Sequence, residues 1–243
     1  MTLFIQIKPD GITEEIKQNA NILELNSFSH RMAFLSNEMV SRGFFSDSNL
    51  AQISAGTDQL PLLTWPFLDF FKSIDIEKNR LIELGSGNST LWFAKNFKNV
   101  ISYETNREWY EQIMNKAPHN CLIKQINESE LILCNIEYNE TDWMLIDFAG
   151  RRSQFIFNML KRNLLPAIVI LDNSDWYRRG ASLLHSKGYI EIPFFGFKSG
   201  QMHLSCTSIF TKEISKFKIK TNTFQAPKHC QMLKNNSWDL ISD

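Results

Sequence analysis

Short apolar runs alternate with segments of helical spacing in the second half of the chain. Four runs are too short for helices and are bounded by polar residues, at 81–84, 99–104, 142–147 and 167–172. Between them, apolar positions recur every three or four residues, as on one face of an amphipathic helix. Strands that alternate with helices in this way predict an α/β domain with a largely parallel sheet.

The pattern changes near residue 189. Residues 189–197 and 203–211 alternate partly at period two, and loop-forming residues 198–201 separate them. This predicts a β-hairpin after the last strand–helix unit. One more strand is expected between the second and fourth runs, and either 121–126 or 131–134 could supply it.

The first 75 residues lack this alternation. Apolar residues near helical spacing predict helices at 12–20 and 28–40. Trp65-Pro66 suits the start of a helix, because proline is tolerated in the first turn. We therefore expect three parts: an N-terminal helical cap over 1–75, the main domain over 76–215 and a C-terminal extension over 216–243.

The composition is that of a folded globular protein. The 243 residues are 43% hydrophobic and 21% charged, which is enough for a core. Basic and acidic residues number 26 each, so no overall basic field favours nucleic acid or an anionic membrane. The four cysteines form no C-x-x-C pair, the N-terminal apolar run is too short for a signal peptide, and no run approaches the ~20 apolar residues of a membrane span. We expect reduced thiols and a cytoplasmic protein.

A glycine-rich turn follows the first of the four runs. Gly85, Ser86 and Gly87 stand between that strand and a helical pattern. Glycine permits positive φ and a close approach of a ligand to the backbone, and the first N–H groups of a helix are free to bind acceptor atoms. A dinucleotide fingerprint needs a third glycine where this chain has Thr90, which weakens the nicotinamide interpretation.

A carboxylate ends the second run. Glu104 lies 17 residues after Gly87 (104 − 87), about the length of one helix and one strand. A carboxylate at this place in nucleotide-binding α/β folds accepts hydrogen bonds from ribose hydroxyls. More than one class of nucleoside-containing cofactor is bound through such an acid, so Glu104 predicts ribose binding without identifying the cofactor.

Glu83, two residues before Gly85, resembles the acid in the first motif of class I S-adenosylmethionine-dependent methyltransferases, here in the form E-x-G-x-G-x-S-T. The resemblance covers roughly residues 60–212. It implies a three-layer Rossmann-like fold, in which a mostly parallel seven-stranded sheet has an antiparallel last strand. It also implies that a helix just before the first strand closes over the cofactor. The cofactor-binding residues that it implies are Glu83, Gly85, Ser86, Gly87, Ser89, Thr90, Glu104, Asp147 and Trp65.

Further polar residues end the later strands. Asp147, Asp172 and Asn173 fall where ligands of open α/β sheets gather. They resemble the Mg²⁺ site of catechol-type O-methyltransferases, and oxygen ligands of this kind suit a hard cation. Asp147 and Asp172 are the candidate catalytic residues, either as bases or through such a cation. His185 and His203 are alternative bases.

Other candidates remain open. Arg151 and Arg152 could bind an acidic substrate, although a solvated helix start also explains them. The family often has an adenine-contacting residue after the third strand, and the candidates here are Asn127, Glu128 and Glu130.

We therefore expect an S-adenosylmethionine-dependent enzyme that methylates an oxygen, or alternatively a nitrogen, of a small molecule or sugar. The expected partner is that small-molecule acceptor, with neither nucleic acid nor membrane evident. Two other functions remain open at this point: an NAD(P)-dependent oxidoreductase, and a non-catalytic binding module on the same fold.

Overall fold

The computed structural model describes residues 28–42, 44, 60–133, 136–139, 142–164, 166–201 and 203–220. The predicted helix at 12–20 and the part of the C-terminal extension after residue 220 lie outside these ranges. No helix among the described residues is long and apolar enough to cross a membrane.

Seven strands form one sheet in the order β3-β2-β1-β4-β5-β7-β6. The first five strands in this order pair in parallel with their neighbours. Strand β7 runs antiparallel to both β5 and β6. The strands are β1 Arg80–Leu84, β2 Asn99–Glu104, β3 Cys121–Gln125, β4 Trp143–Ile146, β5 Ile168–Asp172, β6 Ile190–Gly196 and β7 Ser205–Thr211. The predicted seven-stranded sheet with an antiparallel last strand is confirmed.

Seven α-helices and one 3₁₀ helix are described. They are α2 Phe28–Ser41, α3 Trp65–Lys72, α4 Asn88–Ala94, α5 Arg107–Met114, α6 Glu128–Ile132, α7 Arg152–Lys161, α8 Arg178–Ser186 and the 3₁₀ helix η2 Ile214–Lys216. From residue 65 onward, helices α3 to α8 alternate with strands β1 to β6, as the sequence pattern predicts.

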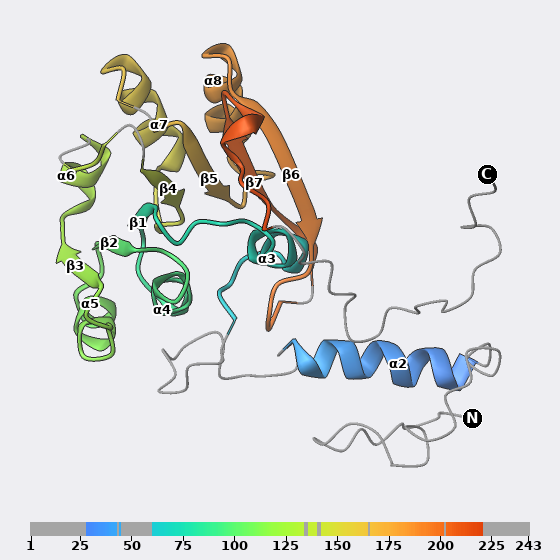
Figure 1. Ribbon diagram of the computed structural model, residues 1–243. Helices are drawn as coiled ribbons and strands as arrows, with labels where there is room; N and C mark the ends of the chain where they lie inside the picture. Colours follow the sequence, from blue (N-terminus) through green and yellow to red (C-terminus); the bar gives the residue numbers. More distant parts are fainter. Residues whose placement is uncertain are drawn as a thin grey trace.

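Three layers follow from the alternation of side chains along the central strands. On one face, Leu81, Leu145 and Ile170 pack with α3 and α4. On the other, Ile82, Met144 and neighbouring residues pack with α6, α7 and α8. In Figure 1, α3, α4 and α5 lie on one side of the sheet and α6, α7 and α8 on the other. A sheet covered on both faces explains why the central strands read as nearly continuous apolar runs.

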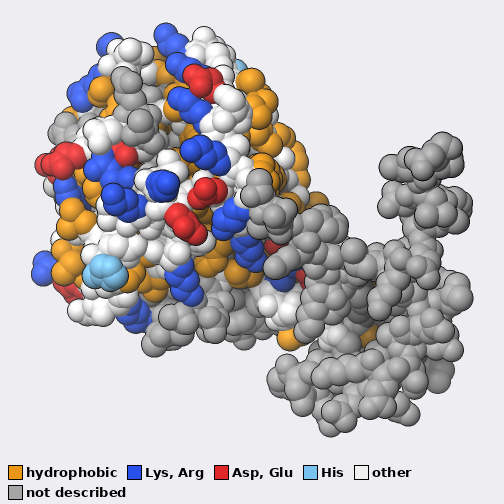
Figure 2. Space-filling view, in the orientation of Figure 1, with side chains coloured by type: hydrophobic (Ala, Val, Ile, Leu, Met, Phe, Trp, Pro, Cys, Tyr) orange, Lys and Arg blue, Asp and Glu red, His pale blue; other side chains and the backbone are white. Residues whose placement is uncertain are grey.

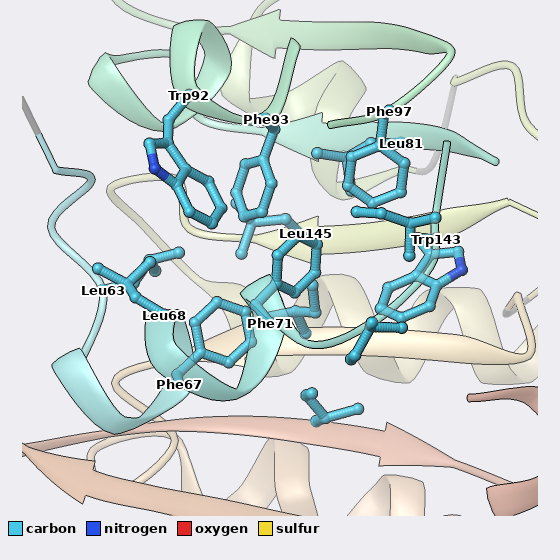
Figure 3. Packing of buried hydrophobic residues seen from close by; sticks show 14 of the residues in the cluster. Leu63, Phe67, Leu68, Phe71, Leu81, Trp92, Phe93, Phe97, Trp143 and Leu145 are labelled. Atoms are coloured by element: carbon cyan, nitrogen blue, oxygen red, sulfur yellow. The ribbon is translucent and has the colours of Figure 1, made fainter. Parts of the chain in front are cut away.

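Aromatic side chains fill the layer between α3 and the sheet. The ring of Phe71 lies 5.1–5.8 Å from the ring centroids of five neighbours. Figure 3 shows this ring among the labelled aromatic side chains of α3, α4 and the strands. Much of the high phenylalanine content is therefore core. The neighbours of Phe71 are Phe67, Trp92, Phe93, Phe97 and Trp143.

The third strand is the first of its two candidates. Residues 121–125 form β3, whereas Leu131 and Ile132 belong to α6. This short helix begins after Asn127, whose backbone N–H donates a hydrogen bond to the Glu130 carboxylate at 3.3 Å. Such a reciprocal N-terminal arrangement favours a helix over a strand.

The N-terminal helix and the segment after β7 both contact the main domain. The predicted helix at 28–40 is confirmed as α2, and Arg42 just after it pairs with Asp69 of α3 at 2.9 Å. Ser199 of the β6–β7 loop donates to the carbonyl oxygen of Arg42 at 2.8 Å. Beyond η2, Ile219 forms an antiparallel bridge with Ile74, so the first residues of the predicted extension are part of the folded unit.

Candidate functional site

A cavity of about 380 Å³ opens at the carboxyl ends of β1, β2, β4 and β5. This edge of an open α/β sheet is where ligands are expected, at the point where the strand order reverses between β1 and β4. Its volume is within the range of small-molecule sites. The lining residues are Leu62, Gly85, Ser86, Gly87, Asn88, Ser89, Glu104, Asn106, Trp109, Asp147, Phe148, Ala149, Asp172, Asn173, Lys198 and Gln201.

Gly85 is required by the packing of the protein itself. Its φ is +97°, and a Cβ here would lie 2.8 Å from the carbonyl oxygen of Asp147 and 2.9 Å from the Cα of Phe148. Both are backbone atoms at the end of β4, so they cannot move aside cheaply. Gly85 thus lets the turn pass directly over the neighbouring strand.

The described residues around Gly87 impose no such requirement. Its φ of 175° is extended backbone that any residue adopts. The nearest atom to an added Cβ would be the indole nitrogen of Trp109 at 3.6 Å, an ordinary contact. Because Gly87 lines the cavity, a glycine here is explained if a ligand approaches the backbone closely.

Glu83 lies beneath the glycine turn and holds it in shape. Its buried carboxyl accepts hydrogen bonds from the hydroxyls of Ser89 (2.5 Å), Thr90 (2.5 Å) and Ser102 (2.7 Å). The Thr90 hydroxyl also accepts from the backbone N–H of Gly87 at 3.0 Å. Neither Glu83 nor Thr90 lines the cavity, and both support the turn from the side away from it. Burial raises the pKa of Glu83 to about 7 against these hydrogen bonds.

Glu104 joins the glycine turn to the end of β2. One carboxylate oxygen accepts from the backbone N–H of Ser86 at 2.7 Å and the other from that of Asn106 at 2.8 Å. The side chain is buried at the cavity wall. A carboxylate offers about four acceptor sites, so these two bonds leave capacity for the hydroxyls of a ligand.

Asp147 stands where β4 ends and is held by a buried arginine. Its Oδ1 lies 2.9 Å from Nη2 of Arg152, while 22% of its side chain stays accessible. Burial raises the pKa of Asp147 to about 7, and the neighbouring Asp172 carboxylate adds to the rise, while Arg152 and Lys198 oppose it. Arg152 also donates to the carbonyl oxygens of Phe148 (2.8 Å) and Asp172 (2.7 Å), so it ties the ends of β4 and β5 together.

Asp172 is paired with a lysine from a distant loop. Its Oδ2 lies 2.5 Å from Nζ of Lys198, and both side chains are 2% exposed. Its Oδ1 accepts from the hydroxyl of Thr207 on β7 at 2.7 Å. The side-chain amide of Asn173 is oriented so that its nitrogen donates to Oδ2 of Asp172 (2.8 Å) and its oxygen accepts from Nζ of Lys198 (3.2 Å). The opposite amide orientation would set two acceptors against each other.

These residues do not fit the Mg²⁺ ion that their sequence pattern suggested. Asp172 is already neutralised by Lys198 and Asp147 is paired with Arg152. A divalent cation between the two carboxylates would be repelled by both fixed positive charges. In the described part of the chain, no group of three His, Cys, Asp or Glu side chains is placed to hold a metal. We therefore derive no step through a metal ion.

The remaining candidates lie outside the cavity wall. Trp65 is 8% exposed and packs between Phe44 and Phe197, with its indole nitrogen unpaired. It is a core residue of α3, and Leu62 of the same segment reaches the cavity instead. The other candidates that do not line the cavity are Asn127, Glu128, Glu130, Arg151, Arg152, His185 and His203.

Both candidate histidines have neighbours on the surface. His185 pairs with Glu191 at 3.0 Å, and the ring of His203 stacks on Trp176 at 6.2 Å between centroids. The structure thus brings neither imidazole to the carboxylates. Asp147 and Asp172 remain the titratable acids that face the cavity beside Glu104.

Eight of the lining residues were not identified as site residues from the sequence, and three of them make contacts that shape the cavity. Lys198 belongs to a segment that the sequence predicts only as a loop, and no feature of the neighbouring sequence predicts that its side chain is buried. Trp109 fits an amphipathic helix and lies against the carbonyl oxygen of Ser86, to which its indole donates at 2.5 Å. Gln201 has a buried side-chain oxygen without a partner among the described residues.

No family model and no curated protein sequence matches the chain. Solved structures do resemble it. TrmK of M. capricolum in complex with S-adenosyl-homocysteine is 17% identical, with 63% of this chain and 70% of that chain covered and a TM-score of 0.46. A dimethyladenosine transferase from Plasmodium falciparum is 14% identical, with 64% of each chain covered and a TM-score of 0.45. A precorrin-6y C5,15-methyltransferase from Geobacter metallireducens is 13% identical, with coverages of 60% and 88% and a TM-score of 0.45. Because these TM-scores lie below 0.5, we base the function on the geometry of the cavity.

Proposed function

We propose that this protein is an S-adenosylmethionine-dependent methyltransferase. One observation carries the proposal: Gly87 lines a cavity at the ligand edge of the sheet, although no atom of the described residues requires glycine there. A backbone left bare on the cavity side suits a ligand that lies against it, next to a carboxylate at the end of β2.

The residues of the cavity wall fit this cofactor. Ser86, Gly87 and Asn88 would lie along its methionine part, and Glu104 would accept hydrogen bonds from its ribose hydroxyls. The indole of Trp109 offers an apolar surface on the same side. When bound, the cofactor supplies an electrophilic methyl group on a sulfonium, and the protein has to orient the acceptor against it.

Asp147 is the candidate general base. It lines the cavity, and a raised pKa of about 7 makes its carboxylate a better proton acceptor than an ordinary aspartate. A base near neutrality removes the proton of a hydroxyl that would otherwise be a poor nucleophile. We assign Asp172 to holding Lys198, because its two oxygens already accept three hydrogen bonds.

The acceptor is proposed to be a small molecule. The described lining residues enclose a cavity of small-molecule size. Figure 2 shows Lys and Arg side chains scattered over one face of the molecule with Asp and Glu side chains among them. The chain as a whole carries no net charge, and nucleic-acid binding depends strongly on basic charge.

Two alternative functions, a nicotinamide-dependent oxidoreductase and a non-catalytic binding module, fit the cavity less well. A nicotinamide-dependent oxidoreductase would need a third glycine at Thr90, but that hydroxyl holds the turn through Gly87 and Glu83. The antiparallel β7 between β5 and β6 also departs from a wholly parallel dinucleotide-binding sheet. A non-catalytic module would have no use for a cavity base such as Asp147.

Calorimetry with S-adenosylhomocysteine and with NAD separates these functions. We expect saturable binding of S-adenosylhomocysteine, weakened in Glu104→Gln, and no binding of NAD. Exposed Glu108→Gln on α5 is the matched control and should bind as the wild type does. Binding of NAD alone would overturn the proposal. Turnover that a chelator abolishes would show that the assignment without metal is wrong.

A further inference from the structure

Lys198 brings a buried positive charge to the cavity from the loop between β6 and β7. Its side chain is 2% exposed and lines the cavity. An ammonium group carries three N–H donors. One reaches Asp172 and a second reaches Asn173, at 2.5 Å and 3.2 Å. The described residues supply no acceptor for the third donor.

The position of this ammonium is fixed by its surroundings. Asn173 has a φ of +52°, an uncommon conformation outside glycine. Its carbonyl oxygen accepts from the backbone N–H groups of Trp176 (2.8 Å) and Tyr177 (3.1 Å), which holds that conformation. Ser205 binds its side-chain amide at 3.0 Å. Lys198 therefore presents its remaining donor from a rigid support.

The charges around the cavity select the sign of an acceptor. At the end of the cavity formed by β4 and β5, the charges of Asp147, Asp172, Arg152 and Lys198 sum to zero when both carboxylates are ionised, and to +1 when Asp147 holds a proton. The carboxylate of Glu104 lies at the end of β2, on the ribose side of the proposed cofactor site. Arg152 does not line the cavity, and three of its five N–H donors go to Asp147 and to two backbone oxygens. A cationic amine placed at this end of the cavity would thus add positive charge where the charge is already zero or positive, whereas an anionic oxygen would meet the remaining donor of Lys198.

We propose that the acceptor is an acidic hydroxyl, such as a phenol or a carboxylic acid, and that its oxygen binds Lys198 and reacts as an oxyanion. This inference rests on the proposed function. The O–H proton passes to Asp147, unless the acceptor arrives ionised. An oxygen lone pair then forms the bond to the methyl carbon, and the methyl–sulfur bond breaks with its electron pair going to sulfur. Lys198 thus compensates the oxyanion where related chemistry uses a metal ion.

Benzoate and benzylammonium test this inference, because they are close in size and opposite in charge. Their binding to the protein saturated with S-adenosylhomocysteine is measured by calorimetry. The test variant is the double substitution Lys198→Met with Asp172→Asn, which removes both members of the buried pair and leaves no lone charge. The control is Lys187→Met, an exposed lysine after α8.

We expect wild-type protein and the control to bind benzoate at least about tenfold more tightly than benzylammonium. The double variant should lose about tenfold or more in benzoate affinity and keep its affinity for S-adenosylhomocysteine. A preference for benzylammonium, an unchanged benzoate affinity in the double variant, or no benzoate binding would overturn the inference and leave the proposed function standing. Failure of wild-type protein to bind S-adenosylhomocysteine would instead refute the proposed function, and the inference with it.

Discussion

The two glycines of the turn should respond oppositely to the same small change. In Gly85→Ala, the new Cβ would overlap backbone atoms of β4 at 2.8–2.9 Å. Overpacking of this kind costs about 1–3 kcal/mol. The φ of +97° adds strain of about 1–3 kcal/mol. The reduced entropy of the unfolded chain offsets about 0.4–1 kcal/mol.

The net loss for Gly85→Ala is therefore about 3 kcal/mol, which lowers the Tm by roughly 6–12 °C in a domain of this size. In Gly87→Ala, the new Cβ on this extended backbone would lie 3.6 Å from its nearest neighbour among the described residues, the indole nitrogen of Trp109. Its stability should change by less than about 0.5 kcal/mol. Its affinity for S-adenosylhomocysteine should fall by about tenfold or more, because the methyl group lies on the cavity lining.

Thermal unfolding and calorimetry on the two purified variants check both effects. An unchanged affinity in Gly87→Ala would refute the view that a ligand lies against this backbone. A wild-type Tm in Gly85→Ala would refute the view that the turn needs glycine to cross β4. The pair is informative because each variant is the control for the other.

Three further predictions concern buried acids and the core. The carboxyl NMR signal of Asp147, assigned by its loss in Asp147→Asn, should titrate near pH 7. The rate of methyl transfer should rise with pH through that value and should be about 10²–10⁴-fold lower in Asp147→Asn. An ordinary titration near pH 4 would exclude the role of Asp147 as a base. Because the pKa of Glu83 is raised to about 7 in the fold, its protonated form is favoured there; stability from this group is present below its ordinary pKa of 4.5 and is lost as pH rises through about 7. Thermal unfolding should accordingly become less pH-dependent in Glu83→Gln, and equal slopes would contradict this. Denaturant unfolding of Phe71→Ala should show a free energy of unfolding about 3–5 kcal/mol below that of the wild type. Phe157→Ala, at a 46% exposed position, should lower it by less than about 1 kcal/mol. Similar losses in the two variants would show that the aromatic cluster around Phe71 is not a main contributor to stability.

The sheet could be predicted because each strand carries its own local signal. The apolar run at 81–84 and its polar boundaries lie within a few residues of β1 Arg80–Leu84. The terminal hairpin was predictable from the partly period-two pattern of 189–197 and 203–211, although that pattern does not say that β7 inserts between β5 and β6. The choice between 121–126 and 131–134 needed a helix-start signal, which the Asn127 to Glu130 spacing carries.

Residues of the cavity were predictable only where they adjoin a strand end. Glu104 and Asp147 follow apolar runs, so topology alone places them at one edge. Lys198 reaches the same place from a loop, and its partner Asp172 is 26 residues away in sequence. No local pattern distinguishes such a buried lysine from a solvated one. The same limit applies to Trp65, whose side chain was expected at the cofactor and lies in the core.

The position that breaks the dinucleotide fingerprint explains how this turn keeps its shape. A third glycine would allow the helix to pack closely on the strand, but Thr90 stands there and is buried. Its hydroxyl accepts a hydrogen bond from the backbone N–H of Gly87 and donates one to the carboxyl of Glu83. The same carboxyl also accepts a hydrogen bond from the hydroxyl of Ser89. Because a glycine has no hydroxyl, it would leave the N–H of Gly87 without this acceptor. The turn is thus organised by a buried acid below it, which leaves the opposite side of its backbone for the cavity.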